Sequence, residues 1–175
     1  SALVTCGLIV LLNTKIGTNP PVGRLLSPSH GFWKNAEPAN QSFAIDVIAK
    51  ELIDSVSVGI DERLVPHVFA SNDHDAYFVQ GYLHAKFRLW QMDFQAYAAG
   101  GRLCEILGEK LGENSVLEAH DRKFRRLGMV YAAENSLEAL QKDIKSKEAL
   151  DAYSDGVNAY IKSLKPENYP IEYKL

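Results

Sequence analysis

The sequence lacks the features that mark several large classes of protein. Its two cysteines, Cys6 and Cys104, are too few for a disulfide framework, and their spacing suits no zinc site. An excess of one charge is also missing, because 19 basic residues stand against 22 acidic ones and neither sign forms a long block. The net charge of −3 does not attract a phosphate backbone, so the composition argues against nucleic acid as a partner.

Short motifs of known chemistry are missing as well. The sequence contains no P-loop, no dinucleotide-binding fingerprint and no G-x-S-x-G, H-E-x-x-H or C-x-x-C motif. His67, His74 and His84 are separated by seven and ten positions, which is not a recognised metal spacing. With 46% apolar and 23% charged residues, the 175-residue chain has the composition and length of one globular domain with a sizeable core.

The first 50 residues divide into an apolar and an irregular segment. Ala2–Leu12 is uncharged and mostly apolar, but shorter than the about 20 residues that span a bilayer. We expect residues 1–12 to be the end of an export or membrane-anchor segment, which makes the protein exported, periplasmic or membrane-anchored; a β-strand or a buried core segment is the alternative. Residues 13–50 are rich in proline and glycine and are expected to wrap irregularly, with Phe32 and Trp33 docked on a folded body.

Residues 51–175 carry clearer signals of secondary structure. Leu52–Asp61 alternates with the period of a half-buried strand, and an extended run resumes at Pro66, so the two predict a β-hairpin. Because proline has no amide donor, the second strand lies at an edge or begins at Pro66. His67 is expected to be a hydrogen-bonded structural residue rather than a ligand or an acid–base group.

A long helix is predicted between Asn72 or Asp73, whose side chains can cap its first turn, and Gly100 with Gly101, which can end it. Two apolar rows predict that most of its sides are buried. Its polar residues recur every three or four positions and form one row, here called the polar stripe: Gln80, His84, Arg88, Gln91 and Gln95. We expect the polar stripe to be buried against another polar surface; a plain solvated face is the alternative.

Charged side chains on and after this helix are expected to form pairs. A buried Arg88 requires an acceptor, because an unpaired buried charge is strongly destabilising. Asp93 and Glu105 are expected to pair with Arg88 or Arg102 rather than to act as a catalytic dyad.

The last third of the sequence is predicted to be helical. Ser115–Glu118 and Asn135–Glu138 have the pattern of capping boxes at helix starts. A further helix covers residues 150–164 before Pro166 stops it, and Gly156 within it predicts a close approach to a neighbour. The residues by themselves therefore indicate a mainly helical domain with a small sheet.

The stretch RLVPHVFASNDHDAYFVQGYLHAKFRLWQMDFQAYAAGGRLCEILGEKLG is followed further on by LDAYSDGVNAYI and YPIEYKL. Together these segments resemble the start of the penicillin amidase family, acylases among the N-terminal nucleophile hydrolases. The family shows a V-P-H-I-x-A strand, a D-A-x-F-A-Q-G-Y helix, R-L-W-Q-M-D, G-R-L-A-E-x-L-G, Y-x-x-G-V-N-A-Y-I and L-P-x-E-F in this order. The resemblance runs from about Asp61 to Leu175.

Some positions depart from the family pattern. Leu64 stands where the family usually has glycine, so the turn cannot rely on a freely rotating φ. Phe87 stands where an aspartate commonly precedes the arginine, and Gln95 and Ala96 replace a usual pair of arginines. Arg88 must therefore find its acceptor elsewhere, in Asp93 or in a partner chain.

The resemblance implies an α+β fold, in which a mainly helical chain adds a short strand hairpin to an αββα sandwich that a partner chain completes. It implies that residues 51–175 are the α-chain part of a precursor that cuts itself, and that the serine at the new N-terminus of the β chain attacks a small acyl-amide substrate. No catalytic residue is then expected in this chain, and Ser1, ahead of all the motifs, is not that serine. The resemblance assigns structural motif positions only: His67, Gln80, His84, Arg88, Gln91, Asp93, Arg102 and Glu105.

The resemblance implies no cofactor for catalysis, but a structural calcium ion in the assembled enzyme, with ligands outside this chain. Two other functions stay open. One is an acyl-homoserine lactone acylase of the same family, and the other is a non-catalytic helical scaffold or interaction module. A downstream Ser-Asn at a processing junction would favour an acylase, and its absence would favour the scaffold.

Overall fold

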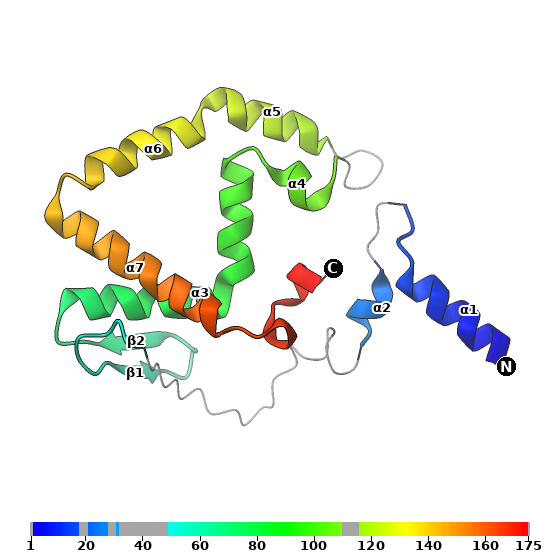
Figure 1. Ribbon diagram of the computed structural model, residues 1–175, viewed down its shortest axis with the longest axis horizontal. Coiled ribbons are helices and arrows are strands. Elements are labelled where there is room, and N and C mark those ends of the chain that lie inside the picture. Colours follow the sequence, from blue (N-terminus) through cyan, green and yellow to red (C-terminus); the bar gives the residue numbers. More distant parts are fainter. Residues whose placement is uncertain (1, 18–20, 28–30, 32–48, 110–115, 175) are drawn as a thin grey trace. The chain divides into compact units, whose positions relative to one another are not determined.

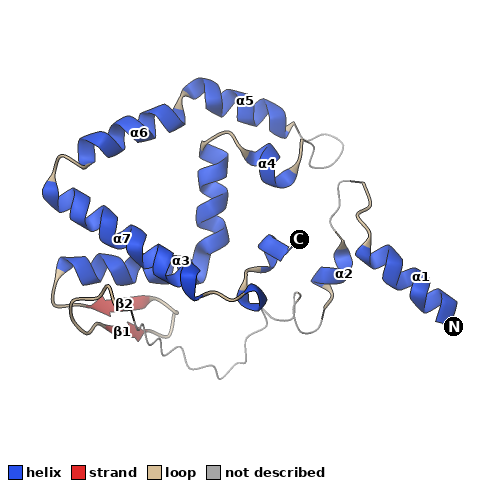
Figure 2. Ribbon diagram, in the orientation of Figure 1, coloured by secondary structure: helices blue, strands red, loops and turns tan. Residues whose placement is uncertain are grey.

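A computed structural model describes residues 2–17, 21–27, 31, 49–109 and 116–174. Within these residues the chain is mainly helical with one two-stranded antiparallel sheet, as predicted (Figures 1 and 2). The α-helices are α1 (Ala2–Asn13), α2 (Val22–Leu25), α3 (Asp73–Ala99), α4 (Leu103–Leu107), α5 (Leu117–Leu127), α6 (Met129–Leu140) and α7 (Ile144–Ser163). The strands are β1 (Ser57–Ile60) and β2 (Pro66–Phe69), and two short 3₁₀ helices, η2 (Pro166–Asn168) and η3 (Ile171–Lys174), follow α7.

The chain divides into two units. The first contains residues 1–39, 93–129 and 165–175, and the second contains residues 40–92 and 130–164. The long helix α3 has residues in both units. Its backbone leaves helical geometry at Arg88, where φ is −143° and ψ is 26°.

The core of the second unit forms where the first half of α3 meets α7. Phe78, Val79, Leu83 and Ala152 are fully or almost fully buried there. Partly buried apolar residues from the hairpin and the segment before it pack against this cluster: Ala49, Leu52, Val56, Val58 and Val68, with Ala159 of α7. The hairpin therefore covers one side of α3 while α7 crosses another (Figure 1).

Two glycines allow α3 and α7 to touch through their backbones. A Cβ atom on Gly156 would collide with the carbonyl oxygen of Phe78, and one on Gly81 would collide with the carbonyl oxygen of Tyr153. Any side chain at these positions would push the helices apart. The close approach predicted at Gly156 is confirmed, and Gly81 is its counterpart on α3.

The hairpin pairs Ser57 with Phe69 and Ile60 with Pro66, so Pro66 begins its strand as predicted. Asp61 closes the turn: its Oδ1 accepts hydrogen bonds of 2.9 Å from the amides of Arg63 and Val65. The turn places Leu64 at φ 62°, in the left-handed region that favours glycine. Leu64 thus occupies the conformation that a glycine would adopt without strain.

Local capping explains both ends of α3. Asn72 Oδ1 accepts a hydrogen bond of 2.8 Å from the amide of Asp75, which confirms Asn72 as the N-cap. At the other end Gly101 has φ 63°, its amide donates to Ala98 O at 3.2 Å, and the amide of Arg102 donates to Tyr97 O at 2.9 Å. This pair of bonds is a Schellman motif, and the predicted glycine stop is confirmed.

A second packed helix pair, α4 and α5, lies in the first unit. Leu103 of α4 is buried, and the carboxylate of Asp121 on α5 accepts hydrogen bonds from the amides of Leu103 and Cys104, at 3.0 and 2.9 Å. The helix α5 ends at Gly128, whose φ is 67°. A hydrogen-bonded carboxylate thus ties the first turn of α4 to α5.

Three local predictions are wrong in part. Ala2–Asn13 is a helix without buried residues, so neither the strand nor the buried core segment is correct. Residues 22–25, expected to be irregular, form the single turn α2. Asn135 starts no helix, because it lies inside α6, and its Nδ2 donates to Tyr131 O; Asp143 caps the next helix instead by accepting from the amide of Ser146.

Two expectations concern residues that the structure does not describe. The docking of Phe32 and Trp33 and the capping by Ser115 lie outside the described residues. No helix within the described ranges combines the length and the apolar character needed to cross a bilayer.

Candidate functional site

The polar stripe on α3 is the largest group of candidate residues, and its side chains are exposed. All five members, Gln80, His84, Arg88, Gln91 and Gln95, face solvent in this chain. The prediction that the stripe is buried is therefore wrong for the chain by itself. The buried side of α3 is narrower than two apolar rows suggested, since Phe87 is 49% exposed.

Two members of the stripe have defined partners. Arg88 Nη1 donates a hydrogen bond of 2.9 Å to Gln91 Oε1, so the acceptor of the guanidinium is a neutral amide on the same helix. His84 Nδ1 lies 3.0 Å from the hydroxyl of Tyr153 on α7, and the two rings meet edge to face with centroids 5.7 Å apart. His84 therefore joins the stripe to the α3–α7 crossing.

His67 has a hydrogen-bond partner at the hairpin turn, as predicted. Its Nε2 lies 3.4 Å from Asp61 Oδ2 at the hairpin turn, and its side chain is 54% exposed. The pKa of Asp61 is lowered, chiefly by the hydrogen bond from the amide of Val65, with burial opposing and His67 adding to the effect. The pair consolidates the turn.

Asp93 and Tyr173 form a contact between α3 and the end of the described chain. The hydroxyl of Tyr173 donates to Asp93 Oδ2 at 3.0 Å. Burial, followed by this hydrogen bond and the charge of Asp93, raises the pKa of Tyr173 well above its usual value. Asp93 is therefore a hydrogen-bond acceptor that holds η3 and not the partner of Arg88.

Arg102 and Glu105 pair as predicted. Arg102 Nη2 lies 2.7 Å from Glu105 Oε2, and its guanidinium carbon lies 4.7 Å from the centre of the Tyr97 ring. The hydrogen bond from Arg102 lowers the pKa of Glu105, against a smaller effect of burial. Both side chains are about half exposed, so the pair contributes little to stability.

The sequence did not single out two buried carboxylates that organise the chain. Asp75 is fully buried and accepts hydrogen bonds from the amides of Ile53 and Asp54, at 2.9 and 2.8 Å, and from Asn72 Nδ2 at 2.8 Å. Burial opposes ionisation, but these hydrogen bonds and the one to His74 outweigh it and lower the pKa of Asp75.

Asp121 repeats this arrangement in the first unit. Burial again opposes ionisation, and the amides of Cys104 and Leu103 outweigh it, which lowers the pKa of Asp121 to about 2. In both places a histidine precedes the aspartate and stacks on an aromatic ring four positions later, His74 on Phe78 and His120 on Phe124. The signal was present in the sequence as H-D-x-x-F, which occurs at residues 74–78 and 120–124.

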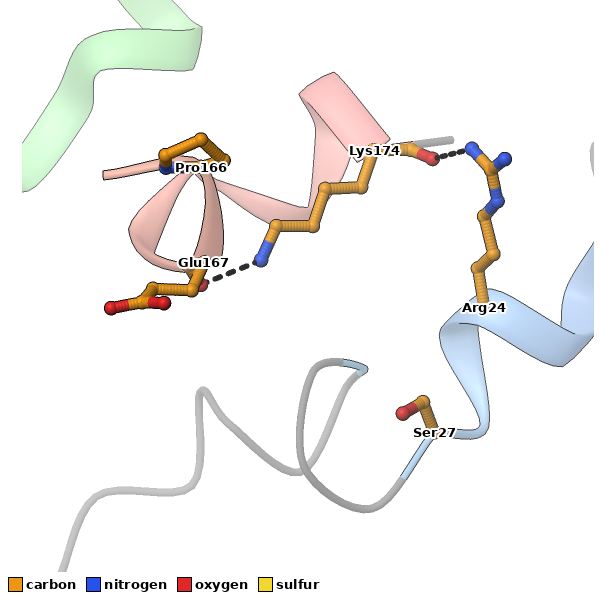
Figure 3. A pocket seen from close by; sticks show the side chains of 5 residues that line it. All are labelled: Arg24, Ser27, Pro166, Glu167 and Lys174. Carbon is orange, nitrogen blue, oxygen red and sulfur yellow. Dashed lines mark hydrogen bonds between the residues drawn. The ribbon is translucent and has the colours of Figure 1, made fainter. Parts of the chain in front are cut away.

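A shallow pocket of about 470 Å³ lies in the first unit between α2 and the 3₁₀ helices (Figure 3). Its lining residues are Arg24, Ser27, Pro166, Glu167 and Lys174. Arg24 Nη1 donates to Lys174 O at 2.6 Å, and Lys174 Nζ donates to Glu167 O at 2.9 Å. Both cations thus bind backbone carbonyls within the pocket wall. Among the described residues no three His, Cys, Asp or Glu side chains are grouped to hold a metal ion.

Comparison with known proteins gives evidence of family membership, which the geometry of the chain does not supply. The family model for penicillin amidase matches residues 55–175. This match covers more than half of the chain. The chain belongs to the penicillin amidase family.

Similar proteins include members with two kinds of substrate in their names. The chain is 40% identical over 111 residues to penicillin acylase 2 proenzyme from Pseudomonas sp. strain SE83, covering 63% of this chain and 13% of that protein. It is 34% identical over 124 residues to the acyl-homoserine lactone acylase QuiP from Pseudomonas syringae pv. tomato, covering 71% and 14%. The chain thus spans about one seventh of these curated penicillin amidase relatives.

A solved structure of the same family is also similar. The chain matches a thermostable penicillin G acylase from Alcaligenes faecalis with a TM-score of 0.58 and 33% sequence identity, over 70% of this chain and 62% of that one. The mainly helical arrangement with its hairpin is therefore a penicillin amidase arrangement.

Proposed function

We propose that this chain is the α-chain part of an acylase that hydrolyses the amide bond between an acyl group and an amine. The observation that carries the proposal is the family match over residues 55–175. The likeness to an acylase structure at 33% identity supports it, as do the acylase names of the relatives. The small share of those relatives that the chain spans is consistent with a partner chain from the same precursor.

In this proposal the chemistry belongs to the β chain. The hydroxyl of its terminal serine attacks the acyl carbon, the α-amine of the same residue takes the hydroxyl proton, and the amine product leaves with a proton. Backbone amides stabilise the oxyanion of the tetrahedral intermediate. Water then attacks the acyl-serine ester and releases the acid, which restores the serine.

The α-chain part supplies structure to the proposed assembly. An isolated two-stranded hairpin is marginal in water, and β1 pairs only with β2 among the described residues, so both strands have an edge available to a larger sheet. The exposed polar stripe of α3 offers amide, imidazole and guanidinium groups to a partner surface. The polar stripe therefore acts in this proposal through assembly, and the αββα sandwich is completed by the β chain.

An acyl-homoserine lactone acylase is the second candidate. It is favoured by the 34% identity with the acylase QuiP over 124 residues. The two candidates share the bond that is broken, an amide, and differ in the acyl and amine groups. The choice between them is an outcome of the assay below.

We further propose that α1 is the end of an export or anchor segment, which places the enzyme in the periplasm or on a membrane. All residues of α1 are uncharged, and Leu3 and Val4 are 88% and 76% exposed. Fractionation of cells that express the full-length protein tests this placement, and uncleaved protein found wholly in the cytosol would contradict it.

The proposed structural calcium has its ligands outside this chain. Its removal by a chelator should lower the melting temperature of the assembled enzyme without affecting catalysis directly.

The decisive experiment is expression of the full-length protein, followed by mass spectrometry and assay on chromogenic acyl-amides and acyl-homoserine lactones. We expect two chains, a serine at the start of the second, and activity that is lost when that serine is replaced by alanine. An intact, inactive, well-folded protein would favour the non-catalytic scaffold instead.

A further inference from the structure

The outward face of α5 is strongly basic. Four cations occupy five consecutive positions near its end: Arg122, Lys123, Arg125 and Arg126, interrupted only by Phe124. Because residues three or four apart share a helix face, Ala119, Arg122, Lys123 and Arg126 lie on one side. All of them are exposed.

The opposite face of α5 is fixed against α4. Asp121 binds the amides of Leu103 and Cys104, and Arg125 Nε donates to Gly101 O at 2.8 Å (Figure 1 shows α4 beside α5). His120 and Phe124 stack on this side, with ring centroids 4.2 Å apart. The helix therefore cannot rotate to hide its cations without breaking these bonds.

Little acidic charge offsets this face. Glu118 pairs with Arg122, but the two side chains are 56% and 67% exposed, so solvent screens the pair. No carboxylate among the described residues pairs with Lys123 or Arg126. Two exposed apolar side chains follow the cations in the sequence. Leu127 at the end of α5 is 59% exposed, and Met129 at the start of α6 is 44% exposed.

We infer that this face of α5 docks on an anionic lipid surface. Lys and Arg side chains clustered on a helix face are attracted to negatively charged headgroups, and each adjacent cation strengthens binding about fivefold. The cations of this face are Arg122, Lys123 and Arg126. Exposed Leu127 and Met129 fit a lipid boundary, where apolar side chains enter the headgroup region, and they have no comparable role on a phosphate backbone.

The test is sedimentation of the full-length protein without α1, which has no buried residues and would by itself bind any vesicle if it is an anchor. The vesicles are phosphatidylcholine, alone or mixed with phosphatidylglycerol. We expect binding to the anionic vesicles that weakens steeply at about 0.5 M salt. Salt at roughly this concentration screens every charge interaction except those between groups in contact. The triple variant Arg122→Gln, Lys123→Gln, Arg126→Gln should bind roughly 100-fold more weakly. The matched control Lys142→Gln, Lys145→Gln, Lys147→Gln removes the same charge from exposed positions elsewhere and should change binding less than about threefold.

Several results would overturn the inference. They are equal binding to neutral vesicles, equal loss in both triple variants, no vesicle binding at all, or tighter binding to duplex DNA than to anionic vesicles. Circular dichroism of the variants checks folding. If the triple variant does not fold, the single variant Arg126→Gln provides the test, with an expected loss of about fivefold.

Discussion

The backbone of Gly156 on α7 lies directly against the carbonyl group of Phe78 on α3. Gly81 makes the equivalent contact with Tyr153, so each helix contributes one glycine to the crossing. Both glycines are buried, as are Phe78 and Ala152 beside them. The core of the second unit is therefore built on backbone contact, which no larger residue can reproduce.

Gly156→Ala should destabilise the protein by about 3 kcal/mol, although alanine is the better helix former, because the new methyl group meets a rigid carbonyl. The measurement is chemical denaturation of the purified protein. Gly59→Ala is the control. The added Cβ would lie 3.9 Å from the nearest atom, so this substitution should hardly change the free energy of unfolding. A Gly156→Ala protein as stable as the wild type would show that the helices do not cross in this way.

Asp75→Asn should cost about 2 kcal/mol, because one of the amides of Ile53 and Asp54 then lacks a buried acceptor. Asp73→Asn, an exposed change in the same helical turn, should cost less than about 1 kcal/mol. Hydrogen exchange should show the loss of protection at residues 53 and 54. Equal effects of the two substitutions would contradict the role of Asp75.

The lowered pKa of Asp121 predicts a defined acid sensitivity. Since the folded-state pKa of about 2 lies below the ordinary value of 3.8, the ionised carboxylate stabilises the fold fully above about pH 4. This contribution disappears as the pH falls from about 4 to about 2. Denaturation curves at several pH values should show a smaller pH dependence in Asp121→Asn, whereas the exposed control Asp155→Asn should keep the wild-type dependence.

Leu64→Gly should stabilise the hairpin by about 0.5 to 1 kcal/mol. Glycine relieves the strain at φ 62°, and its larger unfolded-state entropy offsets part of the gain. Thermal denaturation measures the effect. Arg63→Gly is the comparison, because this neighbour has no positive φ, and the substitution should lower the melting temperature.

Arg88→Ala should change the stability of the chain by less than about 1 kcal/mol, because Arg88 is exposed and its hydrogen bond joins it to a neighbouring glutamine. If the polar stripe contacts a β chain, the same variant should reduce the yield of the assembled enzyme. Native mass spectrometry measures that yield, and Lys86→Ala, an exposed change on the same helix outside the stripe, provides the control.

Strong local signals were read correctly from the sequence. The hairpin, the Asn72 cap, the glycine stop of α3 and the close approach at Gly156 each depend on residues whose backbone preferences act within a few positions. The helix start predicted at Asn135 was wrong because Asn135 and Ser136 imitate a cap, while their side chains bind the carbonyls of Tyr131 and Ala132 inside α6.

The sequence by itself determined the family, because ordered motifs from Asp61 onward identify it without any coordinates. It also determined which side chains of α3 share a face, since helical periodicity depends only on spacing. Only the tertiary structure decided what covers each face. In the folded chain the polar stripe is exposed, whereas Asp75 and Asp121 are buried. The environment of each side chain depends on residues far away in the sequence, such as Ile53 for Asp75 and Leu103 for Asp121. Spacing along one helix cannot encode where the amides of another segment come to lie.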